Sequence, residues 1–91
     1  MNNLDELRKQ INECDIKLID EFKKRMSLVK EVALYKKENN LAIFDEKREK
    51  ELINKNISYL NDEELEEYFL NFFNSLLNES KRYQKKVIDN E

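Results

Sequence analysis

The chain has 91 residues, which suits one small domain, and it contains no glycine, no proline and no histidine. Without glycine it has no primed hairpin turn, no glycine-rich phosphate loop and no dinucleotide-binding fingerprint. The 17 basic and 20 acidic residues are interspersed and give a net charge of −3, so nothing in the charge balance favours nucleic acid as a partner.

The sequence holds one cysteine, Cys14. With no histidine beside it, zinc motifs, disulfide frameworks, Cys–His pairs and Ser–His nucleophiles are excluded. A lone thiol suits a reducing compartment, the apolar runs are too short to cross a membrane, and the N-terminus lacks the layout of a secretory signal. We therefore expect a cytoplasmic protein with no metal site, no nucleic-acid partner and no membrane segment.

The first predicted element is a helix over about residues 4–37. Its apolar residues recur at spacings of three, four and seven and fall on one stripe, roughly 80° wide. The residues of this stripe are Leu4, Leu7, Ile11, Leu18, Phe22, Val29 and Val32. The helix is expected to end at Asn39 and Asn40, which tolerate helix-ending conformations.

Two further helices are predicted, over about residues 46–56 and 62–87. Asp45 is a suitable N-cap for the first of them. Asn61 is expected to cap the second, with Glu64 three residues later as in a capping box. The apolar face of the last helix consists of Leu65, Phe69, Phe73, Leu76, Leu77 and Val87. The predicted fold is all-α, a single domain over residues 1–91 with one very long, one short and one medium helix.

The length of the first helix predicts a dimer. About 34 helical residues extend roughly 50 Å, whereas a compact globule of this size has a radius of gyration of about 12 Å. Two shorter helices from the same chain cannot cover such a rod. A second copy related by a two-fold axis is the simplest cover, so we expect an intertwined helical homodimer.

Two cations, Arg25 and Lys36, lie at the centre of the apolar stripe of the first helix, about 16 Å apart along its axis. Long cationic side chains often extend past an apolar surface to reach water, which is the ordinary explanation for one such residue. For two on one line this explanation weakens, because burying an unpaired charge costs several kcal/mol. The pattern favours a pocket that needs positive charge.

Polar groups also occupy the inward faces of the other two predicted helices. Asp45, Arg48 and Glu49 share one face, where the alternative is an ordinary surface ladder of ion pairs. Ser80 and Gln84 lie about 40° apart within the apolar face of the last helix. The alternative there is a serine bonded to the preceding turn and a glutamine that reaches the rim. Taken together, the three helices predict a pocket for a small, multiply anionic ligand that carries a hydroxyl.

Arg8 lies about 25 Å from Arg25 along the first helix, so one chain cannot bring both to one pocket. If two first helices pair antiparallel about a centre near residue 20, the partner's Arg8 is level with residue 32. That position is between Arg25 and Lys36. The dimer expected from helix length would then also complete the site.

Three segments resemble the all-helical chorismate mutases: "LDELRKQINECDIKLIDEFKKRMSLVKEVALYKK", "DEKREKEL" and "NESKRYQ". They cover nearly the whole chain in the family's order and spacing. The resemblance implies a Claisen rearrangement of chorismate to prephenate in phenylalanine and tyrosine biosynthesis, with no cofactor. It fits a free-standing enzyme and a domain of a larger fusion equally. The connection "NNLAIF" lacks the proline that is common in the family, a departure that concerns loop shape.

The family also implies a role for each matched residue. Arg8 of the partner chain, Arg25 and Arg48 would hold the two substrate carboxylates, with help from Ser80. Lys36 and Gln84 would donate hydrogen bonds to the ether oxygen, and Asp45 and Glu49 would fix the ring hydroxyl. Two alternatives stay open: an isochorismate pyruvate-lyase on the same scaffold, and a non-catalytic helical dimerisation or regulatory module.

Overall fold

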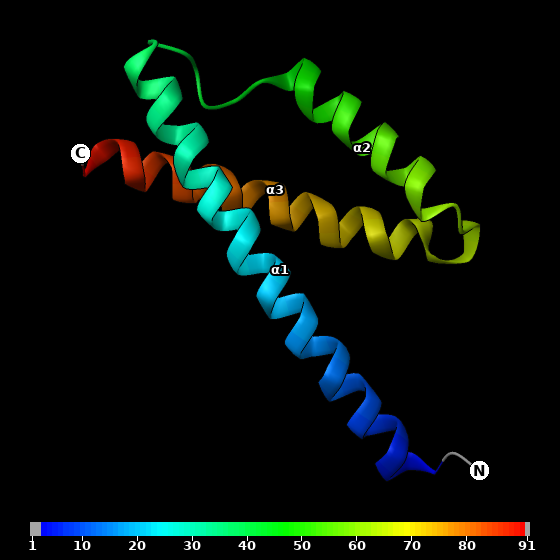
Figure 1. Ribbon diagram of the computed structural model, residues 1–91. Coiled ribbons are helices and arrows are strands. Elements are labelled where there is room, and N and C mark those ends of the chain that lie inside the picture. Colours follow the sequence, from blue (N-terminus) through cyan, green and yellow to red (C-terminus); the bar gives the residue numbers. More distant parts are fainter. Residues whose placement is uncertain (1–2, 91) are drawn as a thin grey trace.

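The computed structural model describes residues 3–90 and contains three α-helices (Figure 1). They are α1 (Leu4–Glu38), α2 (Glu46–Leu60) and α3 (Glu66–Asp89), with a short 3-10 turn, η1 (Glu63–Leu65), before α3. The described part of the chain contains no strand. The prediction of an all-α fold with one very long, one short and one medium helix is confirmed.

The ends of α1 are fixed by asparagines. The side chain of Asn3 accepts a hydrogen bond from the backbone N–H of Glu6 at 2.9 Å, which satisfies one free donor of the first turn. Asn39 is the C-cap, and Asn40 follows in the left-handed region with φ of 56°. Asparagine tolerates that conformation better than most residues, so the two asparagines end the helix as expected.

The second helix begins where predicted and ends four residues later than predicted. Asp45 accepts a hydrogen bond from the backbone N–H of Arg48 at 3.0 Å and is the expected N-cap. At the other end, Ile57 and Leu60 are half-buried and remain helical. No glycine or proline interrupts this stretch, so the helix continues until Asn61 takes a left-handed conformation with φ of 45°.

The prediction that Asn61 is the N-cap of the third helix is wrong. Asn61 is the C-cap of α2, and its N–H bonds to the carbonyl of Ile57 at 3.0 Å. Asp62 takes over as the next cap and accepts from the N–H of Glu64 at 3.1 Å. That bond starts the 3-10 turn, so α3 itself begins at Glu66 and not at residue 62.

The helix α3 is the centre of the fold. It packs against both α1 and α2, whereas α1 and α2 are not packed against each other within the described chain. In Figure 1, α1 crosses α3 and α2 lies alongside the earlier half of α3. The buried apolar residues are Ala33 from α1 and Phe73, Leu77 and Val87 from α3. This core is small, and it is built on α3, the helix that both of the others contact.

The N-terminal half of α1 extends away from the other helices as a free arm (Figure 1). Every described residue from 3 to 24 is exposed, including Leu7 and Ile11, at 43% and 58%. The radius of gyration is 16.5 Å, against about 12 Å for a compact chain of this length. One chain therefore leaves much of the apolar stripe of α1 without cover. No helix in the described part is long and apolar enough to cross a membrane.

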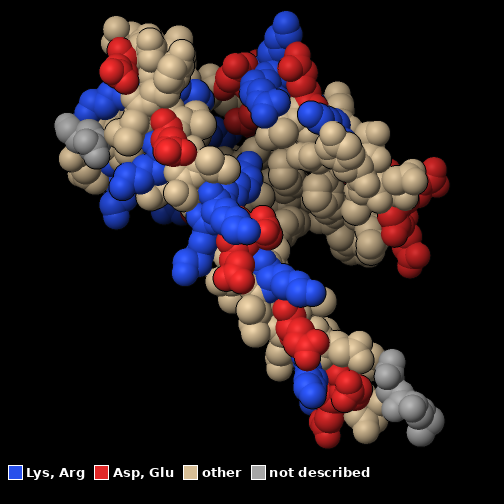
Figure 2. Space-filling view, viewed as in Figure 1, with Lys and Arg blue, Asp and Glu red and all other residues tan. Residues whose placement is uncertain are grey.

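Charged residues of both signs alternate along this arm, as Figure 2 shows. The broad surface over α2 and α3 on the right of the same view is largely free of charged side chains. Acidic and basic groups thus do not separate into two faces in this view. The chain offers no extended basic surface there of the kind that nucleic acid would require.

Candidate active site

Arg25 is the cation at the contact between α1 and α3. It is half-buried, and its guanidinium donates a hydrogen bond to the hydroxyl oxygen of Ser80 at 2.5 Å. The guanidinium carbon also lies 5.9 Å from the centre of the Phe73 ring. Burial lowers the pKa of Arg25 because the charged form loses contact with water. The side chain therefore stays at the helix contact instead of extending past it to solvent.

Ser80 and Gln84 are the two buried polar residues of α3, at 4% and 7% exposed. The Ser80 hydroxyl donates to the carbonyl of Leu76 at 2.7 Å and accepts from Arg25, so the bond to the preceding turn and the contact across helices exist together. The buried Oε1 of Gln84 has no hydrogen-bond partner among the described residues. An unpaired buried polar atom costs about 1–3 kcal/mol, so this amide points to a ligand that would bond to it.

Lys36 lies on α1 at the end of the helix nearer the α1–α2 connection. It is half-buried, and its ammonium donates to the backbone carbonyl of Ile43 at 2.8 Å. An ammonium has three donors, so this contact leaves two for other acceptors. Lys36 thus attaches the connection to α1 directly beside the start of α2.

The three residues predicted on α2 differ in what they contact. Asp45 and Arg48 are exposed, and their described contact is the cap between the Asp45 carboxylate and the Arg48 backbone. Glu49 is half-buried and forms an ion pair with Lys81 of α3, with Nζ 3.1 Å from Oε2. Lys81 was not among the residues predicted for the site. The sequence places Lys81 next to Ser80, but its ion pair with Glu49 depends on how α2 packs against α3.

Arg8 is exposed on the free arm of α1. It lies 17 residues before Arg25 on the same helix, or about 25 Å along the axis. The single chain therefore does not bring Arg8 to the other candidate residues. The remaining seven lie on the last half of α1, at the N-cap and first turn of α2, and on the last half of α3. Of these seven, Arg25 and Ser80 are in direct contact.

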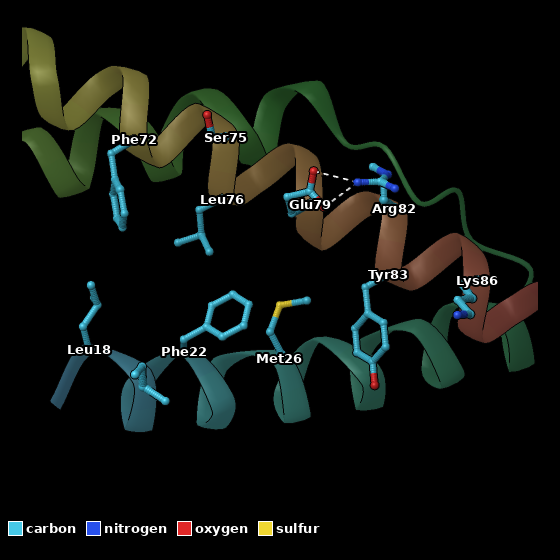
Figure 3. Close-up of a pocket in the computed structure, with 11 residues that line it drawn as sticks. Leu18, Phe22, Met26, Phe72, Ser75, Leu76, Glu79, Arg82, Tyr83 and Lys86 are labelled. Carbon is cyan, nitrogen blue, oxygen red and sulfur yellow. Dashed lines mark hydrogen bonds and ion pairs between the residues drawn. The ribbon is translucent and has the colours of Figure 1, made fainter. Parts of the chain in front are cut away.

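A separate groove of about 750 Å³ lies between α1 and α3 (Figure 3). Leu18, Phe22 and Met26 project from α1 toward Phe72, Leu76 and Tyr83 of α3 in this view. Ile19, Ser75, Glu79, Arg82 and Lys86 complete the lining. None of the eight predicted site residues lines this groove.

Two of the three charged residues that line the groove, Glu79 and Arg82, pair with each other, and Lys86 is the third. Arg82 donates to both carboxylate oxygens of Glu79, at 2.8 Å and 2.7 Å, so the two charges largely satisfy each other. The walls are mainly hydrocarbon and aromatic rings. The groove suits an apolar partner, whereas the region around Arg25, Lys36 and Gln84 suits an anion with hydrogen-bonding oxygens. No group of three or more metal-ligating side chains is found among the described residues.

Comparison with known proteins identifies the family. The sequence model of one family, Chorismate mutase type II, matches residues 7–85. No curated protein and no solved structure matches the chain. The matched segment covers most of the sequence and includes all eight predicted site residues. The chain therefore belongs to the type II chorismate mutases, an all-helical family whose substrate is chorismate.

Proposed function

We propose that the protein is a chorismate mutase, an isomerase that rearranges chorismate to prephenate in phenylalanine and tyrosine biosynthesis. The reaction is an intramolecular [3,3] shift and needs no cofactor, metal or covalent intermediate. One structural observation supports the proposal in addition to family membership. Half-buried Arg25 is bonded to buried Ser80, and one turn further along α3 the buried amide of Gln84 has an unpaired oxygen.

In this proposal, arginine side chains bind the two carboxylates of chorismate. Arg25, Arg48 and the partner's Arg8 hold the carboxylates, and Ser80 assists beside Arg25. Guanidinium groups suit this task because their planar donors match the geometry of a carboxylate. Chorismate is flexible, and holding both ends of it in a chair-like shape removes much of the entropic part of the barrier.

Lys36 and Gln84 provide the electrostatic stabilisation of the transition state. Negative charge develops on the ether oxygen as its bond to carbon breaks. A fixed ammonium and an amide N–H aimed at that oxygen stabilise the transition state more than the substrate. Oxygen and nitrogen of an amide exchange places by rotation of the group, so the site of the unpaired atom of Gln84 can equally hold a donor.

The ring hydroxyl is assigned to the acidic pair on α2. Asp45 uses one carboxylate oxygen to cap the helix, which leaves its other oxygen to accept from a ligand. Glu49 is partly covered by α3 and held by Lys81. The two carboxylates begin the same helix as Arg48, so one turn of α2 supplies groups of both signs to a substrate that needs both.

We also propose that the working form is an intertwined homodimer and that residues 1–91 form one domain within it. The exposed apolar stripe on the arm of α1 and the hydrocarbon groove, which share Leu18, are surfaces that water would otherwise wet. A second copy supplies an apolar helix of matching length, and an antiparallel pairing brings the partner's Arg8 between Arg25 and Lys36. The free thiol of Cys14 agrees with a reducing compartment such as the cytoplasm.

A substrate comparison tests the proposed function. Purified protein is incubated separately with chorismate and with isochorismate, and the products are separated and identified by mass and retention. We expect prephenate from chorismate at a rate proportional to enzyme. Pyruvate and salicylate from isochorismate at a higher kcat/KM would instead assign the lyase activity. No turnover of either substrate would favour the non-catalytic module.

A further inference from the structure

The ion pair between Lys81 and Glu49 joins two helices and is partly buried. Lys81 on α3 lies 3.1 Å and 3.3 Å from the two carboxylate oxygens of Glu49 on α2, and the two side chains are 28% and 22% exposed. The other three ion pairs found among residues 3–90 each lie within one helix, with side chains 56–77% exposed. Exposed local pairs of that kind contribute little to stability, whereas the Lys81–Glu49 pair joins two helices with a defined geometry.

A second contact restricts the same ammonium. The Nζ atom of Lys81 lies 4.7 Å from the centre of the Phe44 ring, within the range of a cation–π interaction. Phe44 is the last residue of the connection before the N-cap of α2. Lys81 is therefore held by a ring on one side and a carboxylate on the other, which leaves it few rotamers in which to satisfy both.

The position of this pair relates it to the proposed site. Lys81 follows Ser80 directly, and about 100° of helix rotation turns it from the face of Ser80 toward α2. Glu49 is one of the two carboxylates assigned to the ring hydroxyl of the substrate. A glutamate side chain has three rotatable bonds, and fixing it before the substrate arrives removes an entropic cost of binding.

We propose that Lys81 is a positioning residue for the reaction: its ion pair holds the Glu49 carboxylate in place to accept the hydrogen bond of the substrate's ring hydroxyl. This inference rests on the proposed function. Lys81 acts through Glu49 and does not itself need to touch the substrate. A lysine that only ties two helices together would affect stability and leave recognition of the hydroxyl unchanged.

The experiment combines variants with a substrate change. We measure kcat and KM on chorismate for the parent, Lys81→Met, Lys81→Arg, Glu49→Gln and the double variant Lys81→Met/Glu49→Gln. Lys85→Met is the matched control, since Lys85 is an exposed lysine of the same helix. The parent and Lys81→Met are also compared on a chorismate analogue that has hydrogen in place of the ring hydroxyl, as a substrate or as a competitive inhibitor.

We expect Lys81→Met to lower kcat/KM on chorismate by about tenfold, which is the loss of one oriented hydrogen bond. Lys81→Arg should recover most of this loss, and Lys85→Met should match the parent. The double variant should be no worse than Glu49→Gln alone, because residues that act through one another are not additive. On the analogue without the hydroxyl, the parent and Lys81→Met should differ by less than about twofold.

Additive losses in the double variant, or an equal penalty on chorismate and the analogue, would overturn the role of Lys81 while leaving the proposed function intact. A parent that does not consume chorismate would overturn both. Circular dichroism establishes that each variant is folded. If Lys81→Met loses helicity, Lys81→Gln replaces it in the same comparison, because it removes the charge and keeps a polar end group.

Discussion

Arg25 shows what it costs to place a charged side chain at a helix contact. Its guanidinium is taken partly out of water at the α1–α3 contact, and that desolvation lowers its pKa from the ordinary value. The lowered pKa means that the folded state disfavours the charge. The guanidinium nevertheless stays protonated throughout the physiological range, so this cost does not vary with pH between about pH 5 and pH 9.

The first prediction concerns replacement of this charge. Arg25→Met keeps an unbranched apolar stem beside Phe73 and leaves Ser80 bonded to the carbonyl of Leu76. We expect the free energy of unfolding to stay within about 1 kcal/mol of the parent, or to rise. Turnover of chorismate should fall by about 100-fold or more, because an oriented charge on the substrate is lost.

Chemical denaturation and a steady-state assay on the same preparations measure both effects. Lys23→Met is the control, because Lys23 is exposed and lies about 160° around α1 from Arg25. An Arg25→Met protein that unfolds more easily and keeps its turnover would mean that Arg25 has a structural role.

The second prediction concerns the buried amide of Gln84. An amide donates a hydrogen bond at any ordinary pH, whereas Gln84→Glu donates only when its carboxyl group is protonated. Above the pKa of the new carboxyl group, activity should fall about tenfold for each unit of pH. The parent should show no such decline over the same range.

The measurement is kcat/KM between pH 5 and pH 9 for both proteins in buffers of constant ionic strength. A profile for Gln84→Glu that runs parallel to the parent's would show that residue 84 does not donate to the ether oxygen.

At the scale of residues, the helical periodicity of the sequence predicted which face of a helix each side chain occupies. Arg25 falls in the apolar stripe of α1 and Ser80 in that of α3, and the two side chains do meet. Lys81 was missed because periodicity gives the face of a residue and not the neighbour of that face. Its contact with Glu49 depends on the relative position of α2 and α3, which no spacing within one helix encodes.

At the scale of elements, the end of α2 was the least predictable feature. Asn61 and Asp62 both have side chains suited to capping, and either arrangement of the two is consistent with the sequence. Backbone conformation decides between them. With φ of 45° at Asn61, the chain leaves α2 in the left-handed region, and Asp62 then caps the following turn.

The third prediction tests this assignment. Asn61→Gly should leave the free energy of unfolding nearly unchanged, since glycine adopts positive φ without a steric penalty. Asn61→Ala should lower it by about 1 kcal/mol, because alanine keeps the Cβ atom that disfavours this conformation and lacks the short polar side chain with which asparagine offsets that cost. Thermal and urea unfolding followed by circular dichroism give the comparison. If alanine and glycine are equivalent at this position, the left-handed cap does not contribute to stability.

At the scale of the whole molecule, the exposed arm of α1 is the feature that one chain cannot explain. The length of the helix followed from an unbroken apolar stripe with no glycine or proline, and so did the expectation of a partner. The sequence does not fix the pairing of the two arms, because a helix with leucines and isoleucines on more than one side allows several registers. Ile16 and Ile19, at 61% and 56% exposed, lie outside the main stripe and illustrate this freedom.

The last prediction tests whether the site is shared between two chains. Arg8→Met and Arg25→Met homodimers should each be nearly inactive, because every site in them lacks one arginine. In a mixed dimer, one site has its Arg25 from the first chain and Arg8 from the second, and both are intact, while the other site lacks both. Random pairing of equal amounts gives half mixed dimers with one active site each, so about one quarter of the parental activity should return.

The two variants, carrying different affinity tags, are unfolded together, refolded and assayed, and each is also refolded alone. Tandem purification on both tags isolates the mixed dimers, whose activity per dimer should be about half that of the parent. If Arg8 and Arg25 served a site within one chain, no dimer in the mixture would contain an intact pair and no activity would return. Within one chain, Arg8 and Arg25 are about 25 Å apart along α1. Recovery of activity on mixing therefore requires the arm of α1 to cross into the site of the partner chain.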